Sequence, residues 1–213
     1  MVLRLVTVLV VTALRFERAA FRHLARRPGW VVRATGVGPA RAGDGLMQLL
    51  DAVRPALVVG AGVCGGLDAA LSSGDLVLPS EAVTPDGERE PLAMDAAFAD
   101  IARRIAGAHG VRAHIGGRMV SVERIASTPA DKRELARLSG ACAVDQETFA
   151  WARASRAAGI PFFAVRAVLD EAQEPIASWH PSAWPSALRL PARALRARRM
   201  LREFGREWPC WRS

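Results

Sequence analysis

The sequence has little cysteine, and its three cysteines, Cys64, Cys142 and Cys210, are odd in number and widely spaced. They form no CxxC pair and have no neighbouring histidines at metal-ligand spacing. This pattern argues against structural zinc and predicts no metal site. We therefore expect a protein of the reducing cytoplasm.

The two common nucleotide-binding motifs are also absent. The chain has no GKS/T P-loop, and Thr35 to Ala40 (TGVGPA) does not fit the spaced GxGxxG fingerprint, so no cofactor is implied. A proline suited to the first helical turn follows the two glycines, and amides at a helix start can receive an anion or a ribose hydroxyl. A plain tight turn explains the same residues.

The apolar N-terminus, Met1 to Leu14, admits two interpretations. It resembles a signal peptide, but it is rich in valine and threonine, lacks a clear cleavage site and runs directly into Arg15, Glu17 and Arg18. We favour a first buried strand, and the stretch is short for a membrane span. A chain of 213 residues is long enough for one domain with a substantial core. We expect this domain to span residues 1–186.

The positive charge is concentrated at the C-terminus. Of a net +8, residues 187–213 contribute +6, because eight arginines face only Glu203 and Glu207. Residues 1–186 are therefore close to neutral, which argues against nucleic-acid binding by this part of the chain. Residues 187–204 form an amphipathic helical pattern that predicts a basic helix and tail, either docked on the domain or lying on an anionic membrane surface.

Apolar runs of strand length alternate with helical patterns, which predicts a layered α/β domain. The expected strands are 3–13, 30–36, 56–62, 74–83, 111–121, 141–145 and 161–169. The expected helices are 16–26, 39–53, 95–109, 129–139, 146–158 and 187–204. Two turn-rich or proline-rich segments, Thr84 to Pro91 and Glu174 to Pro185, are candidates for a flap over a site. His180 in the second flap is a candidate for substrate contact.

A glycine-rich strand exit, Gly60 to Asp68 (GAGVCGGLD), has more glycines than a turn requires. Because glycine has no Cβ, a flat ring or a sugar can approach the backbone there. Cys64 within this segment is a candidate nucleophile, but no Cys/His/Asn arrangement in the sequence supports that role.

Two carboxylates follow apolar strands: Glu147 comes after 141–145 and Asp170 after 161–169. A partly buried carboxyl group has a raised pKa, which suits a general acid. Glu17 falls in the first turn of a predicted helix, where the helix dipole alone also explains an acid.

The ordered set of segments resembles the nucleoside phosphorylase and nucleosidase superfamily, which includes purine nucleoside phosphorylases, methylthioadenosine/adenosylhomocysteine nucleosidases and futalosine hydrolase. The resemblance extends from the first strand to about Gln173. Its segments are TALRFE, TGVGPA, VVGAGVCGGLDAALSSGDLVLPSEAV, CAVDQETFAWA and PFFAVRAVLDEA. It implies a three-layer α/β/α fold with a central mixed β-sheet, and cleavage of the N-glycosidic bond of a purine, adenosine-like nucleoside.

The resemblance also implies residue roles. Glu147 matches the carboxylate that binds the ribose 2′- and 3′-hydroxyls, Asp170 the acid that shares its proton with purine N7, and Glu17 the acid that orients and deprotonates water. The remaining substrate contacts fall on Gln146, Gly62, Val63, Gly65, Gly66 and Val122.

The chain departs from the family pattern at several of these positions. Gln146 replaces the usual Met, Val63 the usual Ser or Thr, Leu169 the usual Ser, and Ser121 to Arg124 an SGD-like turn. A nucleoside-binding module without turnover is therefore the alternative function. The nucleophile is also open: Glu17 favours water, whereas Arg15, Arg18 and Arg33 are cations able to hold inorganic phosphate as co-substrate.

The arginine-rich helix after the acid segment is similar to the layout of the hopanoid-biosynthesis branch, whose members remove adenine from a lipid-linked adenosine. Such a substrate would give the tail a reason for peripheral contact with the inner face of the membrane. Members of the superfamily commonly form dimers or hexamers, so the resemblance implies a homodimer or higher homo-oligomer.

Overall fold

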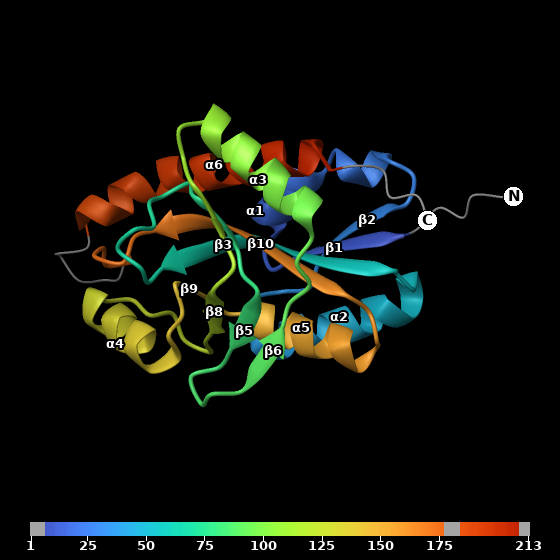
Figure 1. Ribbon diagram of the computed structural model, residues 1–213, viewed down its shortest axis with the longest axis horizontal. Coiled ribbons are helices and arrows are strands. Elements are labelled where there is room, and N and C mark those ends of the chain that lie inside the picture. The colour runs from blue at the N-terminus through green and yellow to red at the C-terminus, as the bar shows by residue number, and fades with distance from the viewer. Residues whose placement is uncertain (1–6, 177–183, 209–213) are drawn as a thin grey trace, which may run out of the picture.

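A mixed β-sheet runs through the computed structural model, which describes residues 7–176 and 184–208. Helices cover both faces of the sheet, with α1, α3 and α6 on one side and α2, α4 and α5 on the other (Figure 1). The strands are β1 Val8–Thr12, β2 Trp30–Ala34, β3 Leu57–Gly66, β4 Leu76–Leu78, β5 Glu81–Val83, β6 Arg89–Pro91, β7 Ala113–Ile115, β8 Arg118–Ser121, β9 Ala143–Asp145 and β10 Phe162–Asp170. The helices are α1 Arg15–Arg18, α2 Pro39–Val53, α3 Ala96–Ala108, α4 Pro129–Ser139, α5 Thr148–Ala157 and α6 Trp184–Arg206, with 3₁₀ turns η1 Ala19–Phe21 and η2 Leu24–Arg26. The predicted three-layer α/β/α class is confirmed.

The sheet is buried on both faces, and β1 shows how its sequence achieves this. Val8 and Val10 join the core beneath α3 and α6, whereas Leu9 and Val11 join the core beneath α2 and α5. Successive side chains of a strand point to opposite faces, so a continuous apolar run satisfies both cores. The strand interpretation of this segment is confirmed from Val8 onward.

Strand β3 organises the sheet because it pairs with three neighbours. Its first half pairs in parallel with β1, and most of its length pairs in parallel with β10. Near its end, Gly65 pairs with Val144 of antiparallel β9 on one side and with Asp170 of β10 on the other. The ends of β9 and β10, which are far apart in sequence, therefore meet at β3.

Three predicted boundaries are wrong. The glycine-rich segment is not a strand exit, because β3 continues to Gly66. The predicted strand 74–83 is divided into β4 and β5 after Leu78, where Pro79 cannot donate to a ladder. The predicted strand 111–121 is divided by Gly116 and Gly117, whose φ values of 91° and 77° turn the chain.

The predicted helix 16–26 and the predicted flaps also differ from the structure. The former is broken into α1, η1 and η2. Thr84 to Pro91 ends in β6, which pairs antiparallel with β5 at the sheet edge. In the second flap candidate, α6 already begins at Trp184, and the stretch with His180 lies outside the described residues.

Helix α6 packs on the sheet through its apolar stripe of Ala197, Met200, Leu201 and Phe204, all buried. Beyond the helix, Trp208 stacks on Phe21 and Trp30 at ring-centroid distances of 5.6 and 5.2 Å. No helix within the described part of the chain has the length and apolar character needed to cross a membrane. The division of the chain at residue 186 stays a prediction.

Candidate active site

A cavity of about 300 Å³ lies where β1, β9 and β10 end around the second half of β3. This is the lower end of the size range of ligand pockets. It gathers most of the predicted site residues: Glu17, Val63, Gly65, Val122, Gln146, Glu147 and Asp170. Gly62 and Gly66 are not among the lining residues, and neither is any residue of the first flap candidate, 84–91.

Glu17 is held by the backbone of two segments. Its Oε2 accepts hydrogen bonds from the amides of Ala13 and Leu14 at 3.0 and 2.8 Å, and its Oε1 accepts one from Val63 of β3 at 2.9 Å. Burial raises the pKa of Glu17, although Arg166 and the three amides favour the ionised form. A rigid carboxylate of raised basicity suits a general base.

Glu147 occupies the N-cap position of α5, directly after β9. Its Oε1 accepts a hydrogen bond of 2.9 Å from the amide of Gly38, the residue before α2. Burial and the nearby Asp145 carboxylate raise the pKa of Glu147 to about 7. The expectation of a raised pKa for this group is confirmed.

An ion pair between Arg166 and Asp145 lies behind these carboxylates. The Arg166 guanidinium donates to Asp145 Oδ2 from Nε at 2.9 Å and from Nη2 at 2.6 Å, and both side chains are almost fully buried. Asp145 also accepts from Ser121 Oγ at 2.6 Å. Burial opposes the charged form of Arg166, but Asp145, Glu147 and Glu17 outweigh it and raise the pKa of Arg166. Arg166 is thus a permanent counter-charge shared by three acids.

Asp170 has a counter-charge of its own in Lys132 of α4. The ammonium of Lys132 donates to Asp170 Oδ2, to the Glu171 carbonyl at 2.7 Å and to the Glu174 carbonyl at 3.0 Å. The Lys132 side chain is 0% exposed, so these acceptors replace water completely. Burial raises the pKa of Asp170, and Lys132 opposes that rise. This direction also agrees with the expectation from sequence.

Glycines of β3 allow these charged groups to approach. A Cβ at Gly62 would lie 2.5 Å from Glu17 Oε1 and 2.8 Å from Arg166 Nη1, and one at Gly65 would lie 3.1 Å from Asp170 Oδ2. The glycines therefore make room for the protein's own side chains. The Val63 amide, which the glycine-rich pattern made available to a ligand, is bound to Glu17 instead.

The departures from the family pattern leave the three carboxylates at the cavity. Gln146 donates from Nε2 to the Glu123 carbonyl at 2.7 Å, which ties it to the Ser121–Arg124 turn. Cys64 lines the cavity, but burial raises the pKa of its thiol well above the usual value, which argues against a thiolate nucleophile.

The rest of the cavity wall is apolar and partly open to solvent. Three of its residues are large and exposed: Leu14 at 42%, Val37 at 39% and Ile125 at 57%. Among the described lining residues there is no lysine, arginine or histidine. A search of the described part of the chain also finds no His/Cys/Asp/Glu group able to hold a metal ion.

Sequence reasoning gave no role to Asp145, Arg166 or Lys132. A signal was present for the two cations: Arg166 is the only charge inside the apolar run Pro161 to Leu169, and Lys132 is the only lysine in the chain. Neither signal names a partner, because the pairs join residues 21 and 38 positions apart.

The sequence model of the phosphorylase superfamily matches residues 12–204, so the chain belongs to this superfamily. The search of curated proteins found no match.

Solved structures of the same fold include futalosine hydrolase of Helicobacter pylori, with a TM-score of 0.76 and 16% identity over 96% of this chain and 99% of that one. Methylthioadenosine/adenosylhomocysteine nucleosidase from the same organism, in complex with butyl-thio-DADMe-Immucillin-A, has a TM-score of 0.77 and 17% identity over 96% and 99%. The nucleosidase from Neisseria meningitidis, in complex with methylthio-immucillin-A, has a TM-score of 0.73 and 22% identity over 95% and 99%.

Proposed function

We propose that this protein cleaves the N-glycosidic bond of a purine nucleoside and releases the free base. The observation that carries the proposal is the convergence of Glu17, Glu147 and Asp170 on one largely apolar cavity. Membership of the phosphorylase superfamily and the fold shared with nucleosidases support it. Three buried acids around a small cavity are costly for folding, which favours a catalytic explanation.

Each carboxylate has a separate task in this proposal. Glu147, when ionised, accepts hydrogen bonds from the ribose 2′- and 3′-hydroxyls and stabilises the positive charge that develops on the sugar. Asp170 donates a proton to N7 of the base, so that the electron pair of the breaking C1′–N9 bond leaves on a neutral purine. Lys132 occupies Oδ2 of Asp170, which leaves Oδ1 for the base.

Water is the nucleophile that the cavity favours. Glu17 takes a proton from the water whose oxygen forms the new bond to C1′. Inorganic phosphate would need a cation, and Arg15, Arg18 and Arg33 line a different cavity from the one that holds the acids. We therefore propose hydrolysis, with ribose rather than ribose 1-phosphate as the second product.

The nucleoside of this proposal is adenosine-like and carries an apolar 5′ substituent. The exposed Leu14, Val37 and Ile125 at the cavity wall support this, because large apolar side chains at a site entrance favour an apolar ligand group. A lipid-linked adenosine of the kind used in hopanoid biosynthesis has this chemistry.

Release of free adenine tests the proposal directly. The purified full chain is incubated with adenosine, methylthioadenosine and a 5′-alkylated adenosine, each with and without phosphate, and the products are separated by chromatography. We expect adenine and the free sugar (ribose from adenosine, the 5-substituted ribose from the other two), no dependence on phosphate, and the highest kcat/KM for the alkylated substrate. If no nucleoside in the series loses its base, the proposed activity is wrong.

The variant Asp170→Asn separates catalysis from binding. Asn cannot transfer a proton, so we expect kcat to fall by about 10²- to 10⁴-fold while adenine still raises the melting temperature. Asp44→Asn, at an exposed carboxylate on α2, is the matched control and should keep full activity. Adenine binding by the wild type without any turnover would favour the alternative of a nucleoside-binding module.

A further inference from the structure

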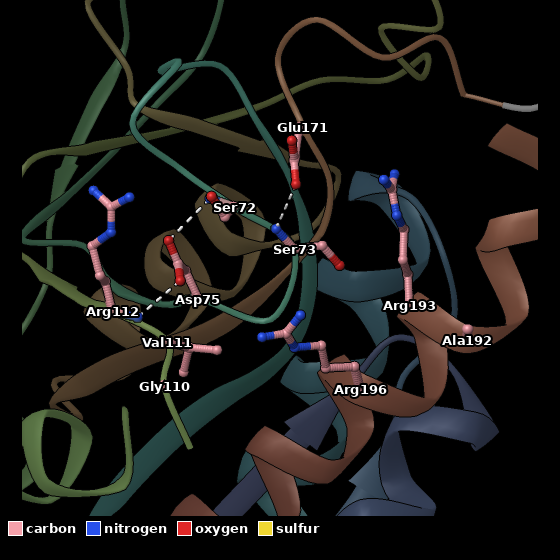
Figure 2. Close-up of a pocket in the computed structure, with 10 residues that line it drawn as sticks. All are labelled: Ser72, Ser73, Asp75, Gly110, Val111, Arg112, Glu171, Ala192, Arg193 and Arg196. Carbon is pink, nitrogen blue, oxygen red and sulfur yellow. Dashed lines mark hydrogen bonds between the residues drawn. The ribbon is translucent and has the colours of Figure 1, made fainter. Parts of the chain in front are cut away.

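A second cavity, of about 400 Å³, lies between α6 and the turn before β4 (Figure 2). It is lined by Ser72, Ser73 and Asp75 of that turn, by Gly110 to Arg112, by Glu171, and by Ala192, Arg193 and Arg196 of α6. None of its described lining residues also lines the cavity of the three acids. None of the sequence motifs pointed to it.

Three guanidinium groups surround this second cavity. No carboxylate among the described residues pairs with the side chain of Arg112 or Arg196, whereas Arg193 donates to Glu174 from both terminal nitrogens, from Nη1 to Oε2 and from Nη2 to Oε1 at 2.6 Å. The planar fork of arginine matches the oxygens of a phosphate group, and a guanidinium stays charged at all physiological pH values.

Ser73 supplies an independent sign that a ligand is expected here. The residue is 7% exposed, yet its hydroxyl oxygen is buried without any hydrogen-bond partner. Figure 2 shows the Ser73 side chain directed towards α6, from which Arg193 and Arg196 extend. A buried hydroxyl without a partner is costly, and a bound acceptor would remove that cost.

The two acids of the cavity are already engaged by the surrounding chain. Asp75 accepts hydrogen bonds from the amides of Ser72 and Arg112 at 3.0 and 2.8 Å, and it contacts His114 Nε2 at 3.2 Å. Glu171 Oε1 accepts from the Ser73 amide at 3.1 Å. The donors that remain for a ligand therefore come from Arg112, Arg196 and the Ser73 hydroxyl.

We infer that this cavity binds an oxyanion, in the form of inorganic phosphate or the phosphate group of a small phosphorylated molecule. Arg196 supplies charge-assisted hydrogen bonds and the Ser73 hydroxyl supplies a further contact, whereas Arg193 stays paired with Glu174. Among the described lining residues there is no aromatic side chain on which a base could stack. The anion is thus bound apart from the nucleoside and takes no part in cleavage of the glycosidic bond.

Isothermal titration of the full chain with inorganic phosphate at low salt tests the inference. Arg196→Gln keeps the length of the side chain but removes its charge, and we expect the Kd for phosphate to rise about tenfold. Ser73→Ala removes one neutral hydrogen bond, and we expect a rise of about fivefold. The matched control is Arg199→Gln, an equal change of charge three residues along α6 at an exposed position outside the cavity, which should leave the Kd unchanged.

A parallel titration with glycerol 3-phosphate separates the two sources of the anion: tighter binding than that of phosphate would indicate a phosphorylated molecule, and equal or weaker binding would indicate phosphate itself. Melting curves confirm that the variants fold. The inference is overturned if phosphate shows no saturable binding, or if all variants bind it as the wild type does. It is also overturned if saturating adenine displaces the phosphate, because the anion would then occupy the nucleoside cavity.

Discussion

At the scale of single residues, the site separates its acids by their counter-charges. Glu17, Glu147 and Asp170 are all buried, and burial raises the pKa of each. Glu17 and Glu147 share Arg166, whereas Asp170 has Lys132 to itself. The proton affinity of Asp170, the proposed acid for the base, is thereby set by a different counter-charge from that of Glu17 and Glu147.

Lys132 is a positioning residue whose removal tests this separation. Lys132→Met keeps the volume but leaves the buried Asp170 carboxylate and two carbonyls without their donor. We expect the free energy of unfolding to fall by about 3 kcal/mol, as for other broken buried ion pairs. Because Lys132 lowers the pKa of Asp170, the variant should also shift the limb of the kcat–pH profile that reports Asp170 towards higher pH.

Urea unfolding and the pH profile are measured for Lys132→Met and for Arg133→Met, the exposed neighbour on the same helix. The control should change the unfolding free energy by less than about 0.5 kcal/mol. A purely structural role for Lys132 would lower stability without moving the pH profile, and that result would contradict the assignment.

Glu147 makes stability depend on pH in a defined direction. Its pKa is about 7 in the folded chain, compared with 4.5 for an unperturbed glutamate. Between these values the unfolded chain has already released the proton that the folded chain retains, so stability falls as pH rises. Relative to Glu147→Gln, the wild type should lose up to about 3 kcal/mol between pH 4.5 and 7 and little above.

The measurement is the difference in unfolding free energy between wild type and Glu147→Gln at several pH values, which cancels the other titrating groups. The same ionisation should lower KM across this range, because the ribose hydroxyls need an acceptor. A stability difference that stays constant or grows with pH would show that Glu147 does not retain a proton in the folded state.

At the scale of elements, β3 decides whether the charged groups can meet. Gly62→Ala would place a methyl group 2.5 Å from Glu17 Oε1 and 2.8 Å from Arg166 Nη1. We expect at least about a hundredfold loss of kcat/KM and a lower melting temperature, because neither buried group can move into solvent. Gly107→Ala, at an exposed position of α3, meets nothing within 4 Å and should be neutral or slightly stabilising. Wild-type activity in Gly62→Ala would contradict the role given to this glycine.

Periodicity predicted the elements that bury apolar faces. The helices α2 and α3 and the strands β2, β9 and β10 lie close to their predicted ranges. The breaks within 74–83 and 111–121 were missed because hydrophobicity continues across Pro79 and across Gly116 and Gly117. At these positions backbone geometry, and not apolar pattern, decides where a strand stops.

The candidate site was predictable only in part. Glu147 and Asp170 stand at strand ends that the apolar runs define, so their position followed from sequence. Their contacts did not, because Gly65 brings β9 and β10 together through pairings between distant segments. Lys132 and Arg166 balance the buried charge. Both were recognisable in the sequence as unusual residues, but their partners were not, because those partners lie in distant segments.

At the scale of the whole molecule, arginines gather on the side of α6 and α1. On α6, Arg199 and Arg202 are exposed, and Arg198 stacks over Phe16 of α1 with its guanidinium 5.6 Å from the ring centroid. Four more exposed arginines, Arg15, Arg18, Arg22 and Arg33, border a smaller cavity beside α1. Because the apolar stripe of α6 is buried in the core, α6 can meet a membrane through this basic face and not through the stripe.

This arrangement refines the proposed peripheral membrane contact into a charge-dependent prediction. Removing residues 187–213 would take Leu201, Phe204 and Trp208 out of the core, so exposed-face variants are the better probe. We expect the wild type to co-sediment with phosphatidylglycerol vesicles at low salt, and Arg199→Gln/Arg202→Gln to bind about thirtyfold more weakly, since each arginine near an anionic surface contributes about 1 kcal/mol. The control, Arg133→Gln/Arg137→Gln, makes the same change on α4 across the sheet (Figure 1). In both pairs one arginine has a glutamate partner. Equal sedimentation of the two double variants would exclude the α6 face as the membrane contact.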